Sequence, residues 1–326
     1  MKLLVSGGAG FIGSCFIRHM LQKHPDYQII NLDCLTYAGN IENLNDIKNN
    51  PNYSFVKGNI CDKNLVLDIT KDVNWIINFA AESHVDNSIL NPEIFIETNV
   101  QGTLNLLQAA LKNNIEKFLQ VSTDEVYGSL GKTGYFLEST PLSPNSPYSA
   151  SKASADLLVK AYFKTYGLPV LNTRCSNNYG PYQYPEKLIP FFISKLLKNE
   201  KVPVYGDGLN VRDWLYVYDH CGAIDTVLHK GKIGEIYNIG GHNEKTNLEI
   251  TKLILNAMNK TESSIEFVND RLGHDRRYAI SNDKITKELG WKPSVTFEEG
   301  IKLTIEWYLS NKEWIESIES KKESLA

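Results

Sequence analysis

The chain has 326 residues and a net charge of −4, which is enough sequence for two lobes because single cores rarely grow beyond about 250–300 residues. The slightly acidic balance argues against a nucleic-acid-binding or membrane-surface protein, and no apolar run approaches the roughly 20 residues that span a bilayer. Five cysteines without a paired metal-binding spacing favour a reduced, cytoplasmic protein that holds no metal.

Strands and helices alternate through the first half of the sequence. Apolar runs with the length of a buried strand occur at 2–6, 27–32, 53–57, 75–79, 118–121 and 170–174. Helical segments of the length required for a parallel crossover lie between them. This alternation predicts an α/β fold with a doubly wound parallel sheet of the Rossmann type.

The first strand runs directly into a glycine-rich turn. Gly7, Gly8 and Gly10 allow the backbone to turn tightly and approach a pyrophosphate, and Gly13 lets the following helix pack closely on the strand. The amino terminus of that helix offers N–H groups to the phosphates. Asp33 follows the second strand, where its carboxylate would bind a ribose 2′-hydroxyl and repel a 2′-phosphate. The pattern predicts NAD rather than NADP, in preference to a purely structural turn.

Two later loops fit the same cofactor. Asp62 either reaches the adenine amino group, with Ile60 packed on the ring, or caps the following helix, and both interpretations remain open. The small side chains of Ala80 and Ala81 would let the pyrophosphate and ribose pass close to the backbone. His84, in the same loop, is expected to be structural rather than catalytic.

The strand at 118–121 is followed by a polar segment that contains two adjacent carboxylates. Ligands collect at the carboxyl ends of parallel strands, so Thr123, Asp124 and Glu125 are expected to face whatever is bound. An acidic pair in a loop is most often simply solvated. At this place in the sheet, however, the pair indicates proton chemistry.

A helix is expected to begin after Ser146, with Pro147 as its first residue, and to place Tyr148 and Lys152 on one face. The lysine ammonium and a nearby positive nicotinamide would both favour the phenolate. We therefore expect a lowered pKa for Tyr148, which would make it a general base. A packed Tyr with a snorkelling Lys is the alternative, but the glycine-rich turn and Thr123 make it the minority interpretation.

The resemblance to a known family rests on five segments, which are 33–40, 80–86, 122–128, 174–183 and 273–278. Over nearly its whole length the chain resembles the extended short-chain dehydrogenase/reductases, and more specifically the dTDP-glucose 4,6-dehydratases. The Asp-Glu pair after Thr123 is the discriminating feature, because epimerases of the same family generally lack it. The sequence departs from the family at Asn87, where Arg is usual near the cofactor, and at Leu272, where Pro is usual.

The resemblance implies NAD-dependent removal of water across carbons 5 and 6 of dTDP-glucose, as in deoxysugar synthesis of the dTDP-rhamnose type. Tyr148 would take the proton of the 4-hydroxyl, Thr123 would hydrogen-bond that oxygen and Lys152 would hold the charge. Glu125 would remove the carbon 5 proton. Asp124, kept protonated by its like-charged neighbour, would protonate the departing 6-hydroxyl.

The resemblance also implies two sets of binding residues. Those expected at the cofactor are Gly7, Gly10, Phe11, Ile12, Gly13, Asp33, Thr36, Ile60, Asp62, Ala80, Ala81, Ser83, Thr98, Val121, Tyr148, Lys152 and Asn178. Those expected at the nucleotide sugar are Ser83, His84, Thr123, Asn177, Lys187, Leu188, Val204, Tyr205, Arg212, Asn247, Arg271 and His274. Arginine pairs bidentately with phosphate, although Arg271 and Asn247 could be surface groups and Arg212 could pair with Asp213.

We therefore expect an NAD-binding domain over 1–180 and a smaller, interleaved α/β domain for the nucleotide sugar over 181–326, with about 213–240 returning to the first sheet. The helices expected at 92–113 and 147–166 carry apolar residues on more than one face. Related enzymes pair these helices across a two-fold axis, so a homodimer is expected. The charged tail from Ser310 is expected to be a solvated terminal helix or disordered.

Three alternatives remain open. A UDP-sugar 4-epimerase or a UDP-glucuronate decarboxylase would use the same Tyr148, Lys152 and NAD, but Asp124 beside Glu125 argues against both. A non-catalytic NAD-binding scaffold is the third alternative. It would not need the reactive groups, which are Thr123, Asp124, Glu125, Tyr148 and Lys152. The sequence does not separate thymidine from uridine, because one methyl group is worth only about 1–3 kcal/mol in a pocket.

Overall fold

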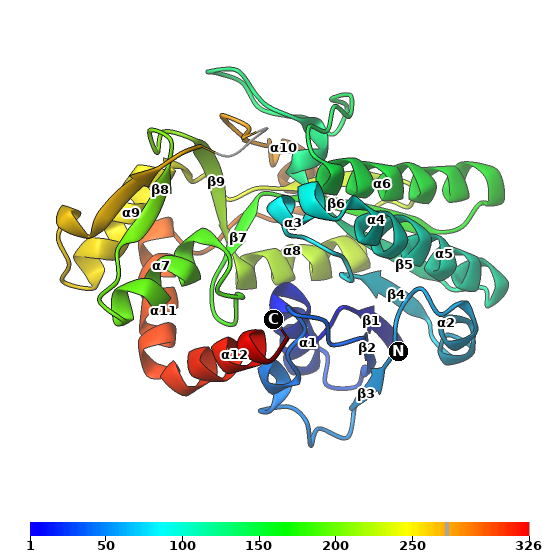
Figure 1. Cartoon of the computed structure of the whole chain (residues 1–326). Helices are drawn as coiled ribbons and strands as arrows, with labels where there is room; N and C mark the ends of the chain where they lie inside the picture. The colour runs from blue at the N-terminus through cyan, green and yellow to red at the C-terminus, as the bar shows by residue number, and fades with distance from the viewer. Residues whose placement is uncertain (271–273, 326) are drawn as a thin grey trace.

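A seven-stranded sheet forms the centre of the first lobe in the computed structural model, which describes residues 1–270 and 274–325 (Figure 1). Its order is β10-β6-β5-β4-β1-β2-β3, and every ladder in it is parallel. The strands are β1 (Lys2–Ser6), β2 (Gln28–Asp33), β3 (Tyr53–Lys57), β4 (Trp75–Asn78), β5 (Lys117–Thr123), β6 (Val170–Cys175) and β10 (Ile236–Ile239). The predicted doubly wound sheet is confirmed.

Helices cover both faces of this sheet (Figure 1). On one face lie α1 (Phe11–Lys23) and α8 (Val217–Lys230), and on the other lie α2 (Lys63–Ile69), α5 (Thr103–Lys112) and α6 (Pro147–Tyr166). Successive strand residues point to opposite faces, so Leu3 and Val5 pack with α1 and α8 while Leu4 packs with α5 and α6. Two separate apolar cores therefore hold the sheet between the helices.

Short segments connect β4 to α5 on the side of α6. They are α3 (Val85–Leu90), α4 (Pro92–Phe95) and a π-helical stretch, Ile96–Gly102, which runs into α5. The helix predicted over 92–113 is therefore present, but its middle is wound more widely than an ideal α-helix.

The second lobe has a core of its own and two small sheets (Figure 1). One sheet has the order β11-β9-β7 and the other pairs β12 with β8. The strands are β7 (Asn177–Tyr179), β8 (Val202–Tyr205), β9 (Val211–Tyr216), β11 (Glu244–Thr246) and β12 (Ile265–Val268), and the helices are α7 (Leu188–Leu197), α9 (Asn247–Ala257) and α11 (Phe297–Ser310). The short helix α10 (Asp283–Leu289) packs on the first lobe instead, where Ile285 joins the core beside α8. Between β9 and β11 the chain returns to the first sheet through α8 and β10.

The C-terminal helix α12 (Lys312–Leu325) is anchored to the first lobe. Trp314 is buried, and its Nε1 donates to Asn43 Oδ1 at 2.9 Å. Asn43 in turn donates through Nδ2 to the carbonyl oxygen of Ala9, in the glycine-rich turn, at 2.9 Å. Ile315 and Ile318 are also buried, so the expectation of a merely solvated or disordered tail is wrong for this part of α12.

No helix among the described residues combines the length and the apolar character that a membrane crossing would need.

A buried carboxylate joins α8 to α1. Asp225 is 1% exposed, and its oxygens lie 2.7 Å from Lys23 Nζ, 3.0 Å from His19 Nε2, 2.9 Å from His24 Nε2 and 2.8 Å from His229 Nδ1. The rings of His24 and His229 are stacked, with their planes 19° from parallel. Burial raises the pKa of Asp225, but hydrogen bonds from His19, Lys23 and His24 outweigh it and hold that pKa well below its usual range.

We expect Asp225→Asn to lower the free energy of unfolding at pH 7 by about 2–4 kcal/mol, because several partly exposed donors lose a buried, charged acceptor. A carboxyl group whose pKa is depressed in the folded protein stabilises the fold fully at pH values above its unfolded-state pKa of about 3.9. This stabilisation is lost as the pH falls from there through the folded-state pKa. The difference between wild type and variant should therefore shrink toward pH 3.

Urea unfolding at both pH values measures this difference. Asp26→Asn, a change at an exposed aspartate, is the control and should alter the free energy of unfolding by no more than about 0.5 kcal/mol. An equal difference between wild type and Asp225→Asn at pH 7 and pH 3 would contradict the interpretation.

Candidate active site

The carboxyl ends of the central strands open into a cavity of about 380 Å³ that residues of both lobes line. The predicted site residues on its wall are Gly7, Gly10, Phe11, Ile12, Gly13, Asp33, Thr36, Ile60, Ala80, Ala81, Ser83, Thr98, Val121, Thr123, Asp124, Glu125, Tyr148, Lys152, Asn177, Asn178 and Lys187. Residues expected at the cofactor and at the sugar thus share one continuous cavity.

The glycine-rich turn forms a cradle that side chains would fill. Gly7 has φ +73°, and a Cβ there would lie 2.6 Å from the backbone nitrogen of Ala80. A Cβ at Gly13 would lie 2.3 Å from the carbonyl oxygen of Gly7. Gly10 is the N-cap of α1, so the amino terminus of that helix opens to the cavity without a capping side chain. This arrangement fits the pyrophosphate of a dinucleotide.

Asp33 is fixed at the end of β2 by two backbone bonds. Its Oδ1 accepts from Leu35 N at 2.8 Å and its Oδ2 from Ala9 N at 2.9 Å. Burial raises the pKa of Asp33, and these two bonds act in the opposite direction. The carboxylate retains lone pairs for a ribose hydroxyl, because each oxygen can accept more than one hydrogen bond.

Two residues of the cofactor-side loops serve as helix caps. Asp62 accepts from the backbone nitrogens of Asn64 and Leu65 at 3.1 and 3.0 Å and does not line the cavity, so the capping interpretation describes it. His84 caps α3 by accepting from Asn87 N at 3.3 Å. It does not line the cavity, although its Nε2 lies 4.0 Å from Glu186, a residue of the cavity wall, so its expected contact with the sugar stays a prediction.

The acidic pair begins a 3-10 turn, Asp124–Tyr127, directly after β5. Thr123 Oγ1 accepts from Glu125 N at 3.3 Å and donates to Asp124 Oδ1 at 3.4 Å. Asp124 is 1% exposed, and its Oδ2 is buried without a hydrogen-bond partner among the described residues. Burial and then the neighbouring Glu125 raise the pKa of Asp124 well above its usual range. A protonated Asp124 is therefore favoured near neutral pH.

Tyr148 and Lys152 lie in the first two turns of α6, which starts with a capping box between Ser146 and Ser149. Lys152 Nζ donates to Val121 O at 2.9 Å. Burial and then the charge of Glu125 raise the pKa of Tyr148, so the expected lowering is wrong for the groups of this chain alone. The cost of burying a phenolate outweighs the favourable effect of nearby cations, and burial is not visible in the sequence.

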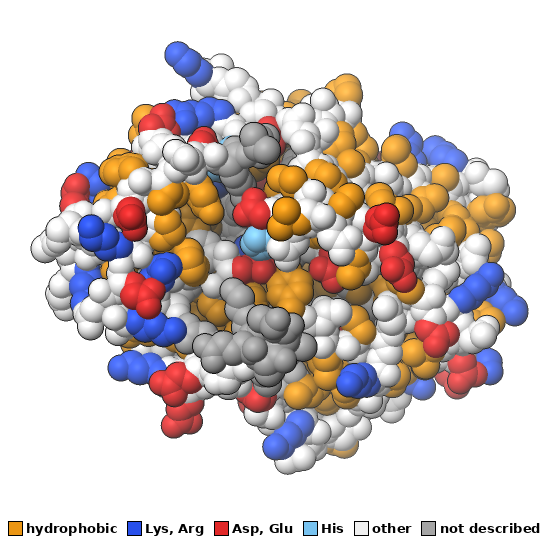
Figure 2. Space-filling view, viewed as in Figure 1, with side chains coloured by type: hydrophobic (Ala, Val, Ile, Leu, Met, Phe, Trp, Pro, Cys, Tyr) orange, Lys and Arg blue, Asp and Glu red, His pale blue; other side chains and the backbone are white. Residues whose placement is uncertain are grey.

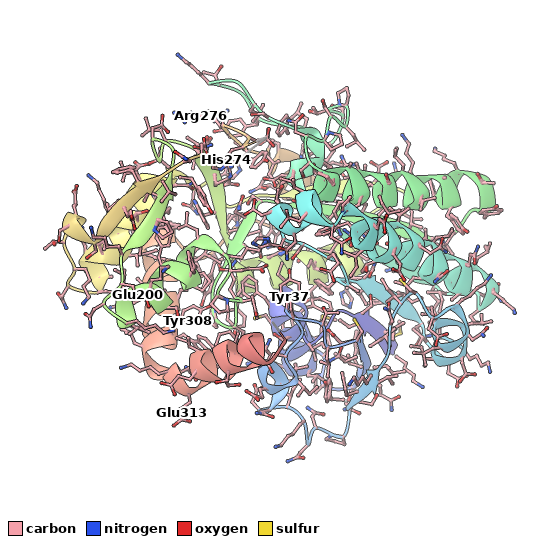
Figure 3. All side chains as sticks on the ribbon, in the orientation of Figure 1. Tyr37, Glu200, His274, Arg276, Tyr308 and Glu313 are labelled. Atoms are coloured by element: carbon pink, nitrogen blue, oxygen red, sulfur yellow. The ribbon has the colours of Figure 1, made fainter. Side chains whose placement is uncertain are left out.

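The remaining residues expected at the nucleotide sugar lie in the second lobe and do not line the cavity. Arg271 and Leu272 lie outside the described residues. Leu188 begins α7, Asn247 begins α9, Val204 and Tyr205 end β8, and His274 lies 2.6 Å from Asp270. Figure 3 shows His274 and Arg276 close together at the edge of this lobe.

Arg212 lies nearer to the reacting groups. Its guanidinium stacks over Tyr278, 4.4 Å from the ring centre, and donates to Asp275 O at 2.9 Å. Its positive charge also lowers the pKa of Asp124, against the larger effect of burial. Asp213, the alternative ion-pair partner, accepts backbone bonds from Gly241 and Asn243.

Sequence reasoning missed a polar contact between the lobes. Tyr37 donates to Glu186 Oε1 at 3.3 Å, and Lys187 Nζ donates to Ser83 O at 3.1 Å (Figure 3 marks Tyr37). Glu82 and Glu186 both line the cavity, and burial and then the charge of Glu186 raise the pKa of Glu82. These residues come from three loops far apart in sequence, so no spacing could have indicated them.

Comparison with known proteins identifies the family. The family described as GDP-mannose 4,6 dehydratase matches residues 4–304. A dTDP-glucose 4,6-dehydratase of Xanthomonas campestris pv. campestris (strain B100) is 52% identical, over 97% of this chain and 95% of the relative. The chain belongs to the dTDP-glucose 4,6-dehydratase family, within the extended short-chain dehydrogenase/reductases.

Solved structures agree with this family membership. DesIV (dTDP-glucose 4,6-dehydratase) from Streptomyces venezuelae, with NAD and TYD bound, is 51% identical with a TM-score of 0.96 and covers 98% of this chain and 100% of its own. A UDP-glucose 4-epimerase with UDP-glucose from Thermotoga maritima shares the fold at 31% identity, TM-score 0.89, over 96% and 100% of the two chains.

Substituting Gly7 tests the cradle. We expect Gly7→Ala to weaken NAD binding by at least about tenfold, because the added Cβ meets the Ala80 backbone and the residue has a left-handed φ. Calorimetric titration with NAD measures the affinity, and circular dichroism checks the fold. The matched control is Gly131→Ala, where a Cβ meets nothing within 4 Å. Equal NAD affinity in both variants would show that the cradle does not hold the dinucleotide.

Proposed function

We propose that this chain is a dTDP-glucose 4,6-dehydratase that converts dTDP-glucose to dTDP-4-keto-6-deoxy-glucose and water in deoxysugar synthesis. The observation that carries the proposal is the acidic pair after β5, with a buried Asp124 whose pKa is raised beside Glu125. A 4-epimerase or a plain dehydrogenase needs one base, whereas dehydration needs both an acid and a base.

The first role of the chain is to activate the sugar. NAD would supply a reversible hydride acceptor at this site, and the glycine-rich turn and Asp33 would hold it. Tyr148 takes the proton of the 4-hydroxyl, and Thr123 hydrogen-bonds the same oxygen. Lys152 stabilises the phenolate electrostatically from the same buried face of α6. The resulting ketone makes the adjacent carbon 5 proton acidic.

The second role is elimination of water. Glu125 removes the carbon 5 proton, and Asp124 protonates the 6-hydroxyl as it leaves. Asp124 Oδ2, buried and without a hydrogen-bond partner in the part of the chain that the structure describes, is the oxygen available to that hydroxyl. Glu125 then returns its proton to carbon 5 as carbon 6 is reduced, so the cofactor ends each turnover in its starting state.

Arg212 and the second lobe bind the rest of the nucleotide sugar in this proposal. The guanidinium of Arg212 suits the diphosphate because its planar fork pairs with phosphate oxygens. Asn177 and Lys187 extend the cavity wall from the reacting groups toward the second lobe.

Incubation of the purified protein with dTDP-glucose, without and with added NAD, tests the function by mass spectrometry. Loss of one water to a 4-keto-6-deoxy sugar nucleotide is expected. An unchanged dTDP-glucose in both reactions, together with turnover of UDP-glucose, UDP-galactose or UDP-glucuronate, would refute the assignment.

Glu125→Gln separates the two halves of the reaction. The variant should still oxidise carbon 4 and reduce bound NAD, because Tyr148, Thr123 and Lys152 are intact. Exchange of the carbon 5 proton with deuterium oxide should fall by about 10²-fold or more, as for removal of a general base. Glu138→Gln, which changes an acidic residue that does not line the cavity, is the control and should exchange the carbon 5 proton normally. Normal exchange in Glu125→Gln would exclude Glu125 as the base.

We also propose that the protein forms a homodimer through α3, α4 and α6. Leu90 is 83% exposed and Leu157 is 56% exposed, and Ile89, Ile94 and Ile96 are exposed beside them in the chain. Hydrophobic side chains gather over this side of the molecule in Figure 2. Exposed apolar side chains on helices that lie against one another, as α3 and α4 lie against α6, are typical of an interface.

Leu157→Glu should shift the protein from dimer to monomer, because a charge on α6 would be buried without a partner. Size-exclusion chromatography with light scattering measures the mass. Leu303→Glu, at an exposed leucine of α11 in the second lobe, should leave the mass unchanged. A dimeric Leu157→Glu protein would place the interface elsewhere.

A further inference from the structure

The C-terminal helix α12 packs in the second lobe but forms a hydrogen bond to the first. Its Trp314 lies in the apolar core of the second lobe, where the centres of the Trp314 and Trp307 rings are 5.1 Å apart. The helix reaches from α11 toward α1 (Figure 1). There Trp314 Nε1 donates at 2.9 Å to Asn43 Oδ1, in the 3-10 turn Ile41–Leu44 of the first lobe. Trp314 therefore connects the core of one lobe to a polar group of the other.

The bond from Trp314 decides which way the amide of Asn43 faces. An indole N–H can only donate, so the amide turns its oxygen toward Trp314 and its nitrogen away from it. Asn43 Nδ2 then donates to Ala9 O at 2.9 Å. Asn43 is 1% exposed, so water has little access to replace a partner lost at either end. A flipped amide would set its oxygen against the carbonyl oxygen of Ala9.

A second bond joins α12 to the same 3-10 turn. Ser317 Oγ donates to Glu42 Oε2 at 2.7 Å. Ser317 follows Trp314 by three residues, so both side chains leave α12 on one face. Asn40 caps the turn from its other end by accepting from Glu42 N at 3.2 Å. The position of Asn43 is thus set jointly by its own lobe and by α12.

The carbonyl group of Ala9, which Asn43 holds, belongs to the glycine-rich turn. It also accepts from Asn40 N at 3.0 Å, and the N–H of Ala9 donates to Asp33 Oδ2 at 2.9 Å. The peptide between Ala9 and Gly10 is planar and trans, so its N–H points away from its carbonyl group. That N–H donates to Gly7 O at 3.2 Å and closes the turn. Holding the Ala9 carbonyl therefore fixes the shape of the cradle.

We propose that Trp314 is a positioning residue for the cofactor: through Asn43 it holds the glycine-rich turn in the shape that binds the pyrophosphate, and it thereby slows the release of NAD. Slow release suits the proposed reaction, on which this part of the inference rests. The cofactor is reduced in the first half of that reaction and oxidised again only when carbon 6 is reduced. A cofactor lost between the two halves would leave the turnover unfinished.

Three variants separate the hydrogen bond from the packing of the core. Trp314→Phe keeps an aromatic ring in the core and removes the N–H donor. Asn43→Leu removes the amide that reaches Ala9. Trp307→Phe makes the same change of side chain in the same core and is the control. Calorimetric titration measures the NAD dissociation constant, stopped-flow fluorescence measures the release of NADH, and urea unfolding without cofactor measures stability.

We expect Trp314→Phe and Asn43→Leu each to raise the NAD dissociation constant about tenfold, chiefly through faster release of the cofactor. Trp307→Phe should stay within about twofold of wild type in both quantities, even where its free energy of unfolding falls as far as that of Trp314→Phe. The double variant should bind NAD within about twofold of Asn43→Leu alone, because both changes remove one link.

Unchanged NAD affinity and release in Trp314→Phe would overturn the proposal and leave α12 a purely structural helix. An equal loss in Trp307→Phe would overturn it too, because the effect would then follow the packing of the core. None of these measurements uses dTDP-glucose. A wild-type protein that binds NAD but makes no keto sugar from dTDP-glucose would instead refute the proposed function, so the two failures are distinguishable.

Discussion

The cost of charging a carboxyl group at the end of β5 governs the chemistry of this protein. Asp124 is almost completely buried, and the carboxyl group of Glu125 is its immediate neighbour. Burial in a low-dielectric site favours the neutral acid, and a second carboxylate at close range favours it further. The same burial raises the pKa of Tyr148 on α6. Asp124, the proposed acid, and Glu125, the proposed base, lie side by side in this cavity.

The fold supplies this environment by bringing strand ends together. In a parallel sheet the residues that follow β1, β2, β4 and β5 reach one edge, and Gly7 lets the first of these loops approach Ala80 within van der Waals contact. The chain then leaves for the second lobe after β6 and returns through α8 and β10. Because the lobes are interleaved, Lys187 and Ser83 meet across the cavity although they belong to different loops.

The sequence predicted those features of the fold and the site that depend on residues close together in the chain. All strands of the first sheet except β10 lie within two residues of the ends predicted above. The cofactor-side residues from Gly7 to Val121 line the cavity, Asp62 excepted, and most of them lie at or shortly after the end of a strand. Contacts between distant segments were not predictable from spacing: Tyr37 with Glu186, Trp314 with Asn43 and the histidines around Asp225. The sign of the Tyr148 pKa shift was missed because burial is a tertiary property.

Infrared difference spectroscopy of the carboxyl groups at pH 7 tests the central claim most directly. The account predicts a protonated carboxyl C=O stretch in the wild-type protein that disappears in Asp124→Asn and persists in Glu125→Gln. If the wild-type spectrum has no such band, or if the band remains in Asp124→Asn, then Asp124 is ionised at pH 7. That result would contradict the assignment of Asp124 as the acid.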